Sequence, residues 1–293
     1  AEIDPVRLKL ALESECASIW CETLSVDVKG AVAIAGSQYM VVDLGAERIS
    51  ALGIQENSIT PKGRDKLKIV GTIIQSWFKG PINLLIQHIK SLLAEAKMER
   101  VQTIILVGGF GESPYVQKRM RNEIAGVRLI VPPDAGLAVL KGAVRFGHNP
   151  SIVASRIMKY TYGTSRFKSF NKKKHPADKK VWKNGEWLVP NCFKVYVRVN
   201  EEVGVDHQVT IWGTPFSKIS RTSVYRTTQV NPDFTTDPGC ELLGTIELEN
   251  SSEVPFKDQD KEDTFLFGDT ELLVKTKNTF TGKEAFMTFE CFK

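Results

Sequence analysis

The clearest chemical signal in this sequence is a glycine-rich turn between an apolar run and a helix-like segment. The apolar run, the turn and the start of the helix read Gln102-Thr103-Ile104-Ile105-Leu106-Val107-Gly108-Gly109-Phe110-Gly111-Glu112-Ser113-Pro114. Glycine lets a backbone approach a ligand closely, and a helix start offers free N–H groups with a partial positive charge. The pattern is typical of phosphate binding, but glycines in an α/β turn also serve tight packing. The turn alone leaves both interpretations open.

A dinucleotide-binding fingerprint fits this turn poorly. Gly109 and Gly111 could supply its first two glycines, but Pro114 stands where the third should be. No acidic residue follows at the end of the next apolar run, where the partner of the ribose would lie. A Walker-type phosphate loop is absent from the sequence.

The segments that must position the turn alternate between helical and strand-like patterns up to residue 150. Apolar spacing predicts helices over 6–22, 81–97, a segment opened by Ser113-Pro114, and 134–147, and buried strands over 38–43, 102–107 and 128–131. Pro81 stands where a first helical turn tolerates proline. Asp134 is a residue type that caps a helix start. Such alternation predicts an α/β layered domain over residues 1–150.

The rest of the chain, residues 151–293, changes to short alternating runs with frequent turn signals. Strands are predicted at 195–199, 209–212, 242–248 and 272–276, and Asn184-Gly185 between apolar flanks predicts a hairpin. Many short strands separated by turns favour a β-sandwich. A lysine-rich stretch at 166–180 is interpreted as a solvated loop, and residues 251–264 as a charged, mobile loop.

Composition limits the function classes. The chain has 293 residues, 42% of them hydrophobic and 25% charged, which fits about two soluble globular domains. Thirty-nine Lys and Arg against 34 Asp and Glu make a mixed surface, so we expect no dedicated nucleic-acid binding. Five scattered cysteines predict free thiols in a reducing compartment and no zinc site.

Targeting signals are also missing from the sequence. No apolar run reaches the roughly 18–20 residues that span a bilayer, and the first residues have neither the basic start nor the apolar core of a signal peptide. We therefore expect a cytoplasmic protein without a membrane span. The first residue is not Met, which suggests that a preceding segment is missing.

Several motifs together resemble the actin-like ATPase superfamily, and within it the divergent 70-kDa heat-shock branch called heat shock 70 kDa protein 12. The glycine turn is similar to the adenosine motif of that superfamily, in which two lobes close over ATP. The other similar segments are Leu12-Glu13-Ser14-Glu15-Cys16-Ala17-Ser18-Ile19, Val131-Pro132-Pro133-Asp134-Ala135-Gly136-Leu137, Leu140-Lys141-Gly142-Ala143-Val144, Leu242-Leu243-Gly244-Thr245, Phe267-Gly268-Asp269-Thr270 and Thr281-Gly282-Lys283. The resemblance implies a second nucleotide-binding lobe at 1–150, followed by a β-rich peptide-binding region at 151–293.

The resemblance also implies a set of site residues. For ATP or ADP with Mg²⁺, the residues expected to bind the nucleotide are Gly45, Gly108, Gly109, Phe110, Gly111, Glu112 and Asp134, and Asp43 is expected to hold the metal through water. No catalytic residue is assigned. Glu112 stands where the superfamily often has a side chain that stacks on adenine, and a surface carboxylate is the simpler interpretation.

The second phosphate loop departs from the family pattern. After Asp43 and Gly45, Ala46 and Glu47 replace two glycines, Arg48 replaces a threonine and Ser50 an aspartate. Side chains there would obstruct the close backbone approach that a phosphate needs. The roughly thirty residues before the helix at 81–97 are also too few for the family's helical subdomain, which implies a truncated or internally deleted member.

Two hypotheses follow. The first is a chaperone-like protein of the 70-kDa heat-shock type with a partial, degenerate ATP site and impaired hydrolysis, because phosphoryl transfer needs charge from both lobes. The alternative is a non-enzymatic module in which residues 151–293 bind unfolded or extended peptides and the nucleotide lobe is a scaffold.

Overall fold

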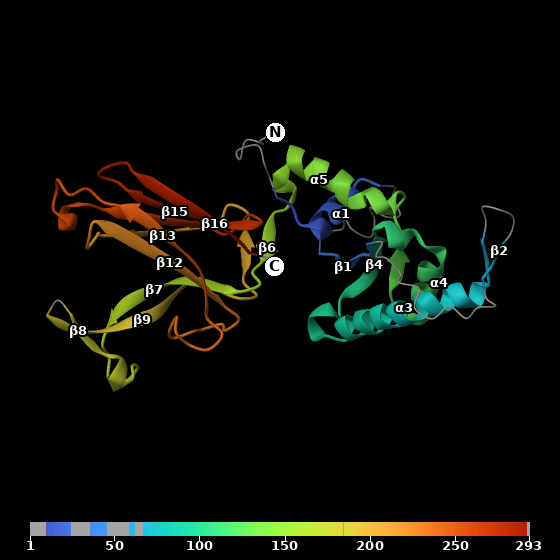
Figure 1. Ribbon diagram of the computed structural model, residues 1–293, viewed down its shortest axis with the longest axis horizontal. Coiled ribbons are helices and arrows are strands. Elements are labelled where there is room, and N and C mark those ends of the chain that lie inside the picture. The colour runs from blue at the N-terminus through green and yellow to red at the C-terminus, as the bar shows by residue number, and fades with distance from the viewer. Residues whose placement is uncertain (1–9, 25–35, 46–58, 62–66, 184, 292–293) are drawn as a thin grey trace. The chain divides into compact units, whose positions relative to one another are not determined.

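The computed structural model describes residues 10–24, 36–45, 59–61, 67–183 and 185–291. The chain divides into two compact units, Ala1–Ile152 and Val153–Lys293 (Figure 1). The first unit mixes helices with a parallel sheet, and the second is built from antiparallel sheets. The chain therefore has the mixed α and β content that the sequence predicts.

A parallel sheet forms the centre of the first unit. Its strands, in the order β1-β4-β5, are β1 (Gln38–Asp43), β4 (Val101–Val107) and β5 (Arg128–Ile130). Every residue of β4 except Gln102 is buried, as expected for a parallel strand covered on both faces. The three predicted strands are confirmed.

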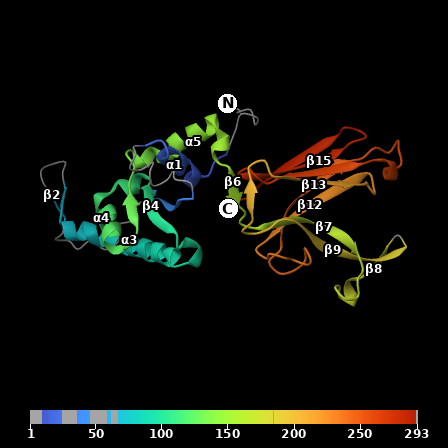
Figure 2. The same cartoon turned by 180° about the vertical axis from the view of Figure 1, so that it is seen from behind.

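Helices cover both faces of this sheet (Figure 2). They are α1 (Glu13–Cys21), α3 (Gly71–Leu93), α4 (Pro114–Glu123) and α5 (Ala138–His148). Ile105 and Val107 of β4 pack with α1 and α5, whereas Ile104 and Leu106 pack with α3 and α4. The period of two along β4 therefore supplies a separate core on each face. A small antiparallel pair, β2 (Ile59–Pro61) with β3 (Leu67–Ile69), precedes α3.

Three predicted helix starts are wrong. The helix predicted over 6–22 begins at Glu13, the first residue of α1. Helix α3 begins at Gly71, so Pro81 lies inside it and not in its first turn. Proline removes one backbone hydrogen bond, but Phe78 before it and Ile82 after it belong to one hydrophobic cluster, which holds both parts of the helix. Asp134 makes no cap hydrogen bond, and a 3-10 turn, η5 (Ala135–Leu137), separates it from α5.

Two antiparallel sheets make up most of the second unit. One has the order β13-β12-β7-β9-β8, with bounds Glu241–Glu249, Ile219–Thr227, Thr161–Ser169, Glu186–Val197 and Val181–Lys183. The other has the order β11-β14-β15-β16, with bounds Gln208–Gly213, Lys261–Leu266, Glu271–Asn278 and Glu284–Glu290. A separate pair joins β6 (Ser155–Ile157) to β10 (Glu202–Gly204).

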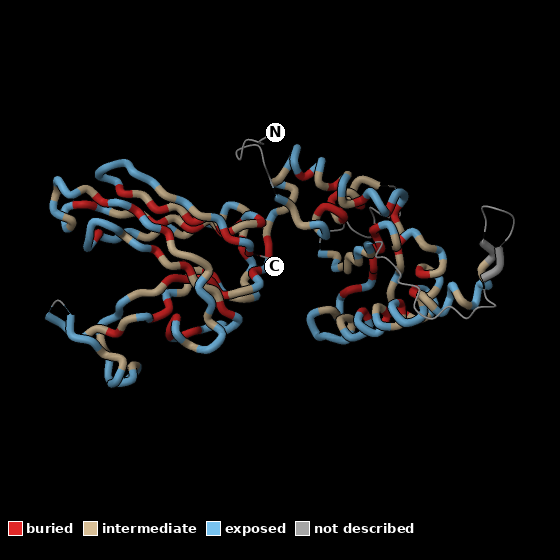
Figure 3. The backbone as a smooth tube through the Cα atoms, in the orientation of Figure 1, coloured by how far each residue is buried: buried red, intermediate tan, exposed pale blue. Residues whose placement is uncertain are grey.

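Both sheets contribute to one hydrophobic core. Tyr162 and Val224 come from the first sheet, and Phe265, Val274 and Phe289 come from the second. Buried residues alternate with half-buried ones along β15 (Figure 3). The period of two places apolar side chains between the sheets and polar ones outside.

The predicted hairpin is confirmed, whereas the predicted loop at 251–264 is partly wrong. Lys183 pairs with Glu186 across the hairpin, and Gly185 has φ +85°. Residues 261–266 form β14, in which Asp263 and Phe265 are buried. The charged residues of this segment predict a loop, although its last residues form a strand. Asp263 is buried in that strand, where Lys261 neutralises its charge.

Candidate functional site

The glycine turn lies at one edge of the parallel sheet, where β1 and β4 end together. Asp43, the last residue of β1, is paired in register with Val107, the last residue of β4. In open α/β sheets, ligands bind at the carboxyl ends of the strands. We call Asp43, Gly45, Gly108 and Gly109 the glycine edge.

Gly108 is required by the backbone itself. It is buried, with φ +83° and ψ 159°, a region that only glycine adopts readily. A Cβ on Gly108 would meet the Asp43 carboxylate and the Leu44 carbonyl group, whose carbon would lie at 2.7 Å. Its N–H donates to the carbonyl of Ala135 at 3.0 Å. Gly108 therefore joins the ends of β1 and β4 to the segment that precedes α5.

Gly109 and Gly136 offer open backbone beside this junction. Gly109 is exposed, and a Cβ there would meet no atom within 4 Å. A Cβ on Gly136 would lie 3.5 Å from the Gly109 Cα. The Gly136 N–H donates to Glu112 Oε1 at 2.9 Å, so the Glu112 carboxylate fastens two adjacent turns.

Two residues of the predicted nucleotide set serve packing. The Phe110 ring is half-buried and stacks on Phe78 of α3, with 5.5 Å between centroids, so its side chain packs against the core. Gly111 is buried, and a Cβ there would lie 3.1 Å from the Leu106 Cγ. The two interpretations of the glycine turn, ligand binding and tight packing, therefore apply to different glycines. Gly111 serves packing, and Gly109 faces solvent.

Asp134 is tied to α5 by its side chain. It adopts a left-handed conformation with φ 54°, and its carboxylate forms an ion pair with Lys141 at 2.7 Å. Lys141 Nζ also lies 4.7 Å from the centre of the Trp20 ring. The Asp134 carboxylate therefore links the turn before α5 to α5 itself, which is a structural task.

The altered phosphate loop is only partly described. Asp43 and Gly45 lie within the described residues, and Ala46, Glu47, Arg48 and Ser50 lie outside them. Among the described residues, no group of three His, Cys, Asp or Glu side chains could hold a metal ion. Asp43 is the one predicted metal ligand, so a magnesium ion there would depend on phosphate and water for its other ligands.

The second unit contains a groove that the sequence motifs did not locate. Strands β7 and β12 pair only between residues 161–164 and 224–227. Beyond this point the two strands diverge, so residues 165–169 of β7 do not pair with residues 219–223 of β12. A groove of about 510 Å³ lies there, lined by residues 164–167 and 219–223 together with Lys183, Leu188, residues 212–217, Lys261 and Asp263. Its volume falls within the roughly 300–1,000 Å³ of ligand sites.

The polar side chains on the floor of this groove have hydrogen-bond partners. Asp263 accepts hydrogen bonds from the hydroxyls of Thr222 and Thr276 and forms an ion pair with Lys261 at 3.2 Å. Thr164 and Tyr196 share a hydrogen bond of 2.6 Å between their hydroxyls. Buried polar groups with partners hold their positions firmly, so the floor is preorganised.

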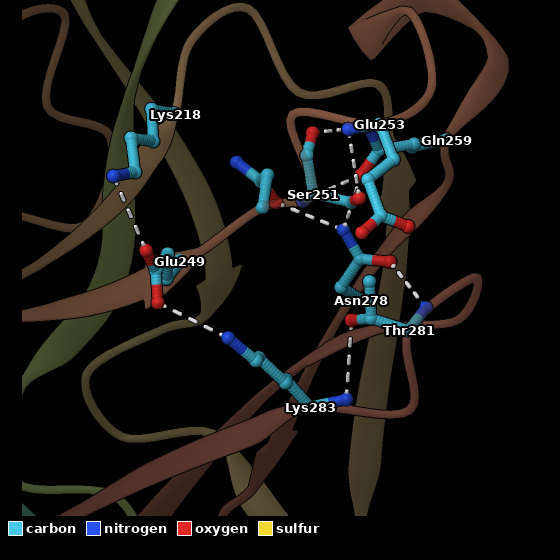
Figure 4. A network of polar contacts seen from close by, with 9 residues as sticks. Lys218, Glu249, Ser251, Glu253, Gln259, Asn278, Thr281 and Lys283 are labelled. Atoms are coloured by element: carbon cyan, nitrogen blue, oxygen red, sulfur yellow. Dashed lines mark hydrogen bonds and ion pairs between the residues drawn. The ribbon is translucent and has the colours of Figure 1, made fainter.

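A buried amide network, which Figure 4 shows around Asn278 and Gln259, lies next to the loop that carries groove residues 214–217. Asn250 Nδ2 donates to the Ser217 carbonyl and to Ser220 Oγ, both at 2.8 Å. Asn278 Nδ2 donates to Asn250 Oδ1 at 3.0 Å and to Gln259 Oε1 at 2.9 Å. The loop that carries the groove residues 214–217 is therefore tied to the core of the second unit.

The five cysteines are free, as predicted, and offer no reactive thiolate at neutral pH. Four are buried and Cys240 is partly exposed. Burial raises the pKa of Cys21 to about 11 and that of Cys291 to about 12. A thiol with a raised pKa stays protonated and is a poor nucleophile.

Comparisons with known proteins identify relatives. No protein-family model matches the chain. Heat shock 70 kDa protein 12A of Mus musculus is 29% identical over 226 residues, which cover 74% of this chain and 33% of that protein. Heat shock 70 kDa protein 12B of Homo sapiens is 30% identical over 219 residues, which cover 70% of this chain and 32% of that protein.

The chain spans about a third of the length of the curated relatives that it matches. No helix among the described residues is long and apolar enough to cross a membrane. The similarity covers most of this chain and agrees with the motifs noted in its sequence. The chain is therefore a relative of the heat shock 70 kDa proteins 12A and 12B.

Proposed function

We propose that the second unit binds an extended polypeptide in the groove between β7 and β12, as a chaperone-like protein would. The observation that carries this proposal is the divergence of the two strands after the pair Thr164 and Val224. Each strand continues for five residues beyond it, along 165–169 and 219–223. Strand edges that lack a neighbour accept an added strand through main-chain hydrogen bonds.

The dimensions suit a short extended segment. Five residues of strand are roughly 16 Å long at about 3.3 Å per residue. Aromatic side chains border the same groove: Trp212 is 60% exposed and Phe216 is 87% exposed. Large exposed apolar side chains around a concave surface favour a ligand with apolar side chains.

Fluorescence anisotropy with labelled extended peptides tests the proposal on the whole chain. Phe216→Ala should weaken binding about fivefold or more, because an exposed ring loses its contact with the peptide. Phe286→Ala is the matched control, since Phe286 is 74% exposed on β16 and does not line the groove. A peptide N-methylated at alternate residues should lose binding, because it cannot donate to a strand edge. Equal affinity of the N-methylated peptide would refute strand addition.

A second candidate function is the binding of ATP or ADP with Mg²⁺ at the glycine edge. The open backbone of Gly109 beside Gly136, at the carboxyl ends of β1 and β4, supports it. Gly109 and Gly45 would lie against the nucleotide, and Asp43 would hold the magnesium ion through water. The ion would supply positive charge to offset that of the phosphates.

Titration calorimetry with ADP and ATP tests this second candidate. Gly109→Val should abolish binding, because a branched side chain would fill the open backbone surface. Gly147→Val is its matched control, since Gly147 lies in α5, also has no atom within 4 Å of a Cβ, and is not a predicted site residue. Absence of heat at millimolar nucleotide would remove the candidate and leave the peptide proposal untouched.

A further inference from the structure

The charged side chains around the groove are mainly cationic. They are Arg166, Lys183, Arg221 and Lys261, against the single carboxylate of Asp263. Two of the cations already have carboxylate partners: Arg221 donates to Glu247 at 2.6 Å, and Lys261 pairs with Asp263.

The other two cations, Arg166 and Lys183, form no ion pair with any carboxylate in the described part of the chain. Arg166 lies beside the hydroxyl of Tyr196 and is partly buried. Lys183 Nζ lies 4.6 Å from the centre of the Phe167 ring, and Phe167 is itself exposed. An aromatic face holds an ammonium group in place without neutralising it.

The segment that carries both cations is rich in Lys and Arg. Residues 166–189, here called the basic arm, include eight Lys or Arg and two Asp or Glu, although the whole chain has a net charge of only +5. Lys180 repeats the arrangement of Lys183, with its Nζ 4.6 Å from the centre of the Trp187 ring. Eight cations therefore lie close together in the sequence, and two of them, Arg166 and Lys183, line the groove.

We propose that the groove selects acidic extended peptides, in which Asp or Glu flanks apolar residues. This inference rests on the proposed peptide binding and adds its substrate class. Carboxylates of the peptide would pair with Arg166 and Lys183, and its apolar side chains would contact Phe167, Trp212 and Phe216. Free strand edges on both sides complement a polypeptide backbone, which a nucleic acid lacks.

Three labelled peptides with one apolar core, flanked by Glu, Gln or Lys, test the selectivity on the full chain. The Glu-flanked peptide should bind at least about fivefold more tightly than the Lys-flanked one in low salt. The difference should shrink as NaCl rises from about 50 to about 500 mM, because salt screens exposed charges. Lys183→Glu should weaken binding of the Glu-flanked peptide roughly five- to tenfold.

Lys172→Glu is the matched control, because Lys172 belongs to the basic arm, is exposed and does not line the groove. It changes the net charge equally and should alter affinity less than about twofold in physiological salt. Equal or tighter binding of the Lys-flanked peptide would overturn the selectivity and leave peptide binding standing. If none of the three peptides binds, peptide binding itself fails. Tighter binding of single-stranded DNA than of any peptide would overturn the proposed ligand class.

Discussion

Replacing Gly108 with alanine should destabilise the first unit strongly. Its backbone lies at φ +83° and ψ 159°, and holding a residue other than glycine there costs about 1–3 kcal/mol. The added Cβ would also meet the Asp43 carboxylate and the Leu44 carbonyl, and such overpacking costs about 1–3 kcal/mol. Together we expect a loss of about 2–6 kcal/mol, a large part of the roughly 5–15 kcal/mol that stabilises a domain.

Gly109→Ala is the neighbouring control. Gly109 has no positive φ, and its Cβ would enter open space. Alanine restricts the unfolded chain more than glycine does, so this variant should be as stable as the parent or up to about 1 kcal/mol more stable. The same chemical change at adjacent positions should thus have very different effects.

Native-state hydrogen exchange with mass spectrometry is the suitable assay, because it reports the two units separately. Gly108→Ala should speed amide exchange in β1 and β4 and leave β15 and β16 at the parent rate. Gly109→Ala should leave all four strands protected. If Gly108→Ala retained the parent's protection in β1 and β4, the close approach of these strand ends would be refuted.

Three further predictions concern other parts of the chain. Gly142→Ala should lower the free energy of unfolding in urea by about 1–3 kcal/mol, because its Cβ would meet the backbone of Cys16 in α1. Gly147→Ala in the same helix should raise the free energy of unfolding by about 0.5–1 kcal/mol. Equal effects of the two variants would contradict the close contact between α1 and α5. Asn278→Ala removes four hydrogen bonds of a fully buried amide and should cost the second unit about 2–5 kcal/mol in the same assay, so a loss below about 1 kcal/mol would rule out the network. Burial raises the pKa of the Cys291 thiol to about 12, so its contribution to stability should be complete below about pH 9 and lost as pH rises towards 12, because the unfolded thiol ionises first. Cys291→Ala should flatten the decline of the free energy of unfolding with pH by up to about 1.4 kcal/mol per pH unit. An unchanged slope would count against the burial of the thiol.

The strands of the first unit could be predicted from local pattern, as could the start of α4 at Pro114, whereas the starts of the other three helices could not. The apolar run of β4 is long and ends at glycine, and both features belong to neighbouring residues. Helix α3 begins ten residues before Pro81, and in that part Phe78 stacks on Phe110, a contact between segments far apart in the chain. Pro81 considered alone predicted a helix start at that residue, but packing on both sides of it keeps the helix continuous.

In the second unit, the charged segment that includes the start of β14 was predicted wrongly for a similar reason. Asp263 and Lys261 suggest an exposed loop when they are considered alone. Inside the fold they neutralise each other and bond to Thr222, which lies 41 residues from Asp263. A local pattern cannot show a partner that only folding supplies.

The sequence by itself determined the kinship of this protein, the alternation of helices and strands before residue 150, the hairpin at Gly185 and the basic arm. These features depend on residue type and short-range spacing. The tertiary structure alone decided which glycines of the turn face solvent, because Gly109 and Gly111 differ only in what packs against them. It also decided where the groove lies. Strands β7 and β12 pair over only four residues each and then diverge, and the paired residues are about sixty positions apart in the chain.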